Sequence, residues 1–98
     1  EMMEVGKDAG EDVWPLPLHA NHFKQIESKI ADIKNVAGIP GASIGAAVIG
    51  TFIDEDLEWV HLDIAGVDWR DEATPTAPVG HAGWGVRFLD ELVRREAN

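Results

Sequence analysis

The residues of this sequence with metal-binding chemistry are two pairs built around histidine. His19 and His22 are three positions apart and share a face if their segment is helical, whereas His61 and Asp63 share a face if theirs is a strand. A zinc site needs three or four converging ligands, and neither pair has a further ligand at a supporting spacing. We therefore expect no metal site built from this chain alone. His19 and His22 should lie at the surface, and His61 should be hydrogen-bonded on a half-buried strand.

The carboxylates fall into two kinds. Residues 54–56 and 71–72 are runs of acids with the pattern of solvated turns. Asp63 lies inside an apolar run, and Asp68 follows that run just beyond Gly66. Because ligands of open α/β sheets bind outside the C-terminal ends of the strands, position alone makes residues 65–69 the stretch expected to face a ligand. Asp63 is expected to accept hydrogen bonds from backbone donors within the core.

Nucleophilic catalysis has little support in this sequence. The chain has no cysteine, and Ser28 and Ser43 lack the context of a nucleophile elbow and a partner base. Residues 80–85 include three glycines and are expected to open a helix, whose N-terminus could accept an anion. Tight backbone packing explains these glycines equally well. We predict no catalytic residue in this chain.

The elements that would position these residues alternate between helices and strands. Helices are expected over residues 1–9, with Gly10 as the stop, over 19–30 with Asn21 as a possible cap, over 42–53, and from 80–85 to the C-terminal end. Strands are expected over residues 31–36 and 58–65, and a loop over 71–78. Two prolines keep residues 13–18 extended. This alternation predicts the α/β class.

Apolar side chains recur at the spacing that would face a core. The expected stripes are Phe23, Ile26 and Ile30 in the second helix and Val60, Leu62 and Ile64 in the second strand. In the last helix the expected stripe is Val86, Leu89 and Val93, helped by Phe88 and Leu92. The helix over 42–53 is apolar on nearly every side, which predicts burial all round. Residues 35–53 carry no charge, but Pro40 would break a helix there, so we expect core burial rather than a membrane span.

Length and charge limit the class of protein. Ninety-eight residues allow one domain with a modest core, and the absence of cysteine excludes a disulfide framework. Eighteen Asp and Glu oppose eight Lys and Arg, for a net charge of −10. A polyphosphate would meet net repulsion, so nucleic acid is not an expected partner, and neither is a membrane.

Four blocks, read in order, resemble the C-terminal part of the catalytic domain of the leucine (cytosol) aminopeptidase family. They are Val-Trp-Pro-Leu-Pro-Leu at 13–18, Ala-Asp-Ile-Lys-Asn at 31–35, the small-residue helix from Gly41, and Trp-Val-His-Leu-Asp-Ile-Ala-Gly at 59–66. The Gly-Trp-Gly-Val-Arg run at 83–87 follows at the expected place. The resemblance covers nearly the whole chain and implies part of a mixed-sheet α/β/α catalytic domain.

The resemblance implies a cytoplasmic, hexameric exopeptidase that removes N-terminal residues from peptides with two divalent metal ions, zinc or manganese. In the family a lysine and several carboxylates bind the metals and an arginine motif holds a bicarbonate-like base. These residues lie upstream of the region that this chain resembles, and the family signature Asn-Thr-Asp-Ala-Glu-Gly-Arg is absent here. Residues 1–98 are therefore expected to be a C-terminal segment that lacks the metal centre and binds no metal itself.

By the same resemblance, the segment contributes substrate-binding residues. Ala65 and Asp68 match positions that line the pocket for the first side chain of the peptide, and Val36 matches a position beside the leaving residue. Asp68 stands where the family usually has an apolar or small residue. It either favours polar or basic first residues or points to solvent.

Two functions follow from the resemblance. The chain is either the pocket wall and scaffold of a complete enzyme or a non-catalytic interaction and assembly module. In both cases we expect the isolated chain to be inactive and to self-associate.

Overall fold

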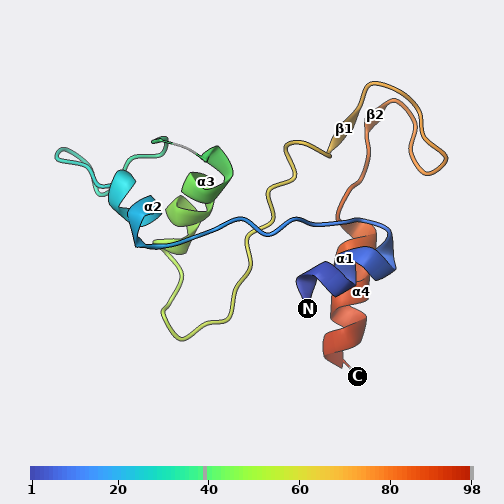
Figure 1. Ribbon diagram of the computed structural model, residues 1–98, viewed down its shortest axis with the longest axis horizontal. Helices are drawn as coiled ribbons and strands as arrows, with labels where there is room; N and C mark the ends of the chain where they lie inside the picture. The colour runs from blue at the N-terminus through green and yellow to red at the C-terminus, as the bar shows by residue number, and fades with distance from the viewer. Residues whose placement is uncertain (39, 98) are drawn as a thin grey trace. The chain divides into compact units, whose positions relative to one another are not determined.

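The computed structural model describes residues 1–38 and 40–97. The chain forms two compact units, which are described one at a time (Figure 1). The terminal unit comprises Glu1–Pro15 and Asp63–Asn98, and the central unit comprises Leu16–Leu62.

Two helices from opposite ends of the chain form the core of the terminal unit. Helix α1 (Met2–Ala9) packs against helix α4 (Val86–Ala97), as Figure 1 shows, and Val5 and Phe88 are fully buried. A Cβ at Gly6 would lie 2.5 Å from the Glu11 carbonyl oxygen, so only glycine permits this close approach. Gly10 ends α1 in the left-handed region at φ 72°, which confirms the predicted stop.

A charge cluster joins the same two helices at their exposed side. The Arg95 guanidinium on α4 contacts the carboxylates of Glu4 and Asp8 on α1, and it is 3.2 Å from Glu91 one turn back on α4. Exposed ion pairs stabilise by at most about 1 kcal/mol each, so the buried Val5 and Phe88 contribute more than this cluster.

A short hairpin leads into α4. Strand β1 (Trp69–Arg70) pairs antiparallel with strand β2 (Gly80–His81), with Trp69 opposite His81. The predicted loop at 71–78 joins the two strands. Residues 80–85 do not open a helix: the first two form β2, and the glycines at 80, 83 and 85 all have positive φ, which excludes helical backbone before Val86.

The predicted apolar stripe of the last helix is correct for its two supporting residues and wrong for its three main ones. Phe88 is buried and Leu92 is half-buried, but Val86, Leu89 and Val93 are exposed. Within the described residues of the terminal unit, α1 is the helix that packs on α4, and it leaves Val86, Leu89 and Val93 uncovered.

The described residues of the central unit, 16–38 and 40–62, contain two helices. Helix α2 (Ala20–Gln25) packs against helix α3 (Gly41–Gly50) around Ile26, Ile44 and Ala47. The helix expected over 42–53 is thus present as α3, but its burial all round is not, because Ile49 is about half exposed. None of the helices in the described ranges is long and apolar enough to cross a membrane.

Helix α2 is half the predicted length because local hydrogen bonds compete with it. The Ile26 carbonyl accepts from the Lys34 amide at 2.7 Å, and the Ser28 hydroxyl accepts from the amides of Ile30 and Ala31. A serine side chain that bonds nearby amides offers the backbone an alternative to the helix. Of the predicted stripe only Ile26 is buried, whereas Ile30 is 99% exposed.

Neither predicted strand forms. Residues 31–36 follow a series of bends, and residues 58–64 are irregular, with no ladder partner in the part of the chain that the structure describes. A strand needs a second strand to take up its backbone groups. Val60 and Ile64, expected in the core, are consequently exposed.

Candidate functional site

The stretch expected to face a ligand forms a tight turn in the terminal unit. The Ile64 carbonyl accepts hydrogen bonds from the amides of Val67 and Asp68, both at 3.0 Å. Asp63 Oδ1 accepts from the Ala65 amide at 3.0 Å. Asp63 therefore bonds a backbone donor as predicted, but it does so from an exposed position and not from the core.

This turn brings together two of the three predicted substrate-binding residues. Ala65 is exposed and Asp68 is half-buried. The Asp68 carbonyl accepts from the Ala82 amide at 2.9 Å, which ties the turn to the segment that enters α4. The third residue, Val36, belongs to the central unit, where its side chain is 74% exposed. The substrate-binding role of all three stays a prediction.

The prediction that His19 and His22 both lie at the surface is correct for His19 only. His19 is exposed, but His22 is buried, and the two rings lie 4.5 Å apart between centroids. His22 Nδ1 accepts from the His19 amide at 3.2 Å, and His19 Nδ1 accepts from the Asn21 amide at 3.3 Å. The pair therefore caps α2, and the cap is His19 rather than Asn21.

The second candidate pair does not form the expected structure either. His61 is exposed, and the strand on which it was expected to be half-buried is absent. Across residues 1–38 and 40–97, no group of three or more His, Cys, Asp or Glu side chains is arranged to hold a metal ion. The described residues therefore do not fit a resident metal centre.

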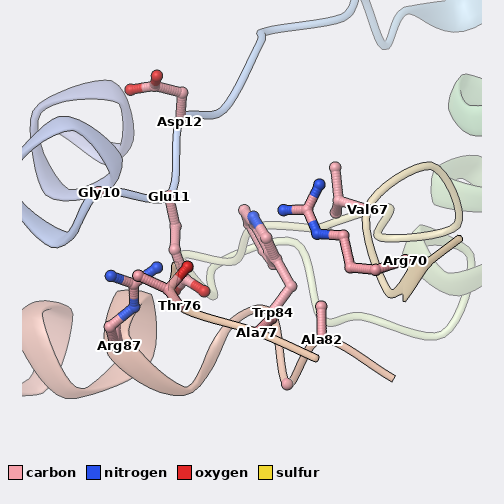
Figure 2. A pocket seen from close by; sticks show the side chains of 11 residues that line it. Gly10, Glu11, Asp12, Val67, Arg70, Thr76, Ala77, Ala82, Trp84 and Arg87 are labelled. Carbon is pink, nitrogen blue, oxygen red and sulfur yellow. The ribbon is translucent and has the colours of Figure 1, made fainter. Parts of the chain in front are cut away.

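A cavity of about 270 Å³ lies beside the turn, within the terminal unit (Figure 2). Val67 of the turn lines it, together with residues from the end of α1, the hairpin and the start of α4. The full lining is residues 10–12, 67, 70, 76–77, 82–84 and 87. Residues 65–69 and 80–85, predicted as separate candidates, both contribute to this cavity, the first through Val67 and the second through residues 82–84.

Glu11 is the buried carboxylate at this cavity. It is 5% exposed, and its two oxygens accept from the amides of Gly85 at 3.0 Å and Phe88 at 2.7 Å. The predicted anion acceptor at this helix start is therefore already occupied by an anion of the chain itself. A carboxylate there satisfies free amides and faces the positive end of the helix dipole. Nothing in the local sequence distinguishes Glu11 from the other acids, because its partners are more than 70 positions away.

Two arginines that were not predicted as site residues also line the cavity. Arg70 comes from β1 and Arg87 from the first turn of α4. The Arg70 Nε atom is buried and has no hydrogen-bond partner among the described residues. Their convergence depends on the hairpin, which the sequence did not predict.

The sequence as a whole matches the catalytic domain of the cytosol aminopeptidase family over residues 1–90. The chain belongs to this family, as the resemblance predicted. Among its relatives, the probable cytosol aminopeptidase of Caulobacter vibrioides is 46% identical over 94 residues, which are 95% of this chain and 19% of that protein. The probable cytosol aminopeptidase of Dinoroseobacter shibae is 48% identical over 86 residues, 87% of this chain and 18% of that protein.

A solved structure confirms the predicted fold class. A mutant of tomato leucine aminopeptidase superimposes with a TM-score of 0.83 at 34% identity, over 96% of this chain and 18% of that chain. The α/β assignment as part of an aminopeptidase catalytic domain is therefore correct. The chain spans about a fifth of the length of the relatives it matches.

Proposed function

We propose that this chain is the C-terminal segment of a leucyl aminopeptidase that removes N-terminal amino acids from peptides. Its part in that enzyme is to form a wall of the substrate pocket and to support the fold. The observation that carries the proposal is the family match over residues 1–90. The relatives' names, probable cytosol aminopeptidase, support peptide substrates and a cytoplasmic location.

We further propose that the complete enzyme depends on two divalent ions, zinc or manganese, and assembles as a hexamer. Two such ions supply an activated water and polarise the scissile carbonyl. Because the described residues offer no fitting ligand set, the proposal assigns the ions to other parts of the enzyme. The role of this chain is confined to binding and scaffolding.

Within the pocket, we propose that Ala65 and Asp68 contact the first side chain of the peptide and that Val36 lies beside the leaving residue. The turn geometry supports the first pair, because the hydrogen bonds to the Ile64 carbonyl fix both residues on one turn. The half-buried Asp68 carboxylate accepts no hydrogen bond from the described residues and is available to a substrate cation.

The second candidate, a non-catalytic interaction module, is favoured by the large exposed apolar side chains. Trp14 in the terminal unit is 83% exposed and Ile30 in the central unit is 99% exposed. Exposed apolar side chains mark a protein interface where they form a contiguous patch. The same surface would be covered by the remainder of a complete catalytic domain, so both candidates account for it.

Leucyl-p-nitroanilide hydrolysis separates the two candidates. We expect the 98-residue chain to show no turnover with added zinc or manganese, and the product of its complete reading frame to show turnover that a chelator abolishes. Metal-dependent turnover by the 98-residue chain would contradict the proposal that other parts of the enzyme bind the metal ions. An inactive complete product, folded and loaded with metal, would favour the interaction module.

A further inference from the structure

The four arginines of the chain divide into two kinds. Arg94 and Arg95 on α4 are each bonded to carboxylates. Arg70 and Arg87 have no ion pair or hydrogen bond to any described residue, although the chain contains 18 Asp and Glu. Arg87 is exposed, so water can solvate its guanidinium group, whereas Arg70 is half-buried and its lack of an acceptor among the described residues is the unexpected observation.

Burial makes the Arg70 group the more informative of the two. Its Nε atom is shielded from solvent and lacks an acceptor, and an ionised donor left unsatisfied in this way is costly. Figure 2 shows the Arg70 side chain directed towards the Trp84 ring, with Arg87 also at the cavity. Native proteins usually provide an acceptor for a buried donor. Among the described residues, the acceptor for Arg70 Nε is missing from this cavity.

The carboxylates at the cavity do not supply that acceptor. Both oxygens of Glu11 are taken by the amides of Gly85 and Phe88. Asp12 is exposed, and in Figure 2 its carboxylate points away from the two arginines. The charged side chains left free to bind a ligand in this cavity are therefore the two guanidinium groups, beside the Thr76 hydroxyl.

We infer that this cavity binds a small oxyanion, either a carboxylate or a phosphate, through Arg70 and Arg87. The planar guanidinium fork matches the paired oxygens of both groups. A volume of about 270 Å³ accommodates a small molecule of this kind. The net charge of −10 repels anions at long range, so the affinity arises from the local site. The inference does not depend on peptidase activity.

The test is titration of the 98-residue chain with inorganic phosphate and, separately, with acetate at constant ionic strength. Calorimetry gives the affinity, and the NMR signal of the Arg70 Nε–H reports on the site. We expect saturable binding of at least one anion with a shift of that signal, and the two titrations decide between phosphate and carboxylate.

Variants show whether the two arginines hold the anion. Arg70→Gln and Arg87→Gln should each weaken binding about tenfold, the loss typical of one charge-assisted hydrogen bond. Arg70→Lys keeps the charge without the fork and should bind more weakly than the wild type but better than Arg70→Gln. Arg94→Gln makes the same charge change at an exposed position of α4 and should leave the affinity unchanged.

The inference is overturned if neither anion shifts the Arg70 signal at tens of millimolar. Equal weakening by Arg94→Gln and Arg87→Gln would overturn it as well, because the effect would then be one of overall charge. Should Arg70→Gln fail to fold, Arg87→Gln and Arg70→Lys carry the same test.

Discussion

Glu11 links the segment after α1 to the start of α4. Its carboxylate satisfies two amides at the start of α4 from a buried position. We expect Glu11→Ala to lower the free energy of unfolding by about 2–4 kcal/mol, because two buried amides lose a charged acceptor. Urea denaturation followed by circular dichroism measures the change.

Two further variants test whether the cap explains that loss. Glu11→Gln keeps one acceptor and should cost less than Glu11→Ala. Asp12→Asn alters the exposed neighbour and should change stability by under about 0.5 kcal/mol. Equal stability of Glu11→Ala and wild type would show that the amides of Gly85 and Phe88 do not need this carboxylate.

Asp68 is the residue expected to set preference for the first residue of a peptide, given the proposed function. In the complete enzyme, Asp68→Ala should lower kcat/KM for Arg and Lys substrates about tenfold relative to Leu and Met, the loss of one partly desolvated ion pair. Asp71→Ala changes an exposed acid three positions further on and should leave the ranking unchanged. Identical ranking by the wild type and Asp68→Ala would show that the carboxylate faces solvent.

At the scale of elements, the sequence predicted helices better than strands because helical hydrogen bonds are local. The backbone groups of α1, α3 and most of α4 find their hydrogen-bond partners within the same helix. Gly10 ends α1 because it adopts the left-handed conformation. Residues 58–65 alternate as a strand should, but alternation cannot provide a neighbouring strand. The hairpin at 69–81 was missed because each of its strands has only two residues.

The candidate site was predictable only where it rested on a continuous stretch of chain. Residues 65–69 were predicted to face a ligand from their place after the apolar run, but the turn that they form with Ile64 was not predicted. Arg70, Arg87 and Glu11 meet only through the packing of α1 on α4 and the pairing of β1 with β2. Contacts between such distant positions are a property of the fold and leave no local pattern.

For the whole molecule, apolar surface and net charge act in opposite directions. Large apolar side chains are exposed in both units, among them Trp14, Ile30 and Phe52. Such surface favours association, whereas a net charge of −10 makes two copies of the chain repel each other. The balance should therefore depend on salt.

We expect the isolated chain to self-associate more strongly at 500 mM than at 50 mM salt, since salt screens the repulsion and leaves the apolar attraction intact. Sedimentation velocity at the two concentrations measures this. Ile30→Ser removes a fully exposed apolar group and should reduce association without loss of helix content, whereas Asn35→Ser, at an exposed polar position, should not. A monomer at both salt concentrations would mean that the exposed apolar side chains are too scattered to form an interface, and the charge alone would then determine the behaviour of the chain in solution.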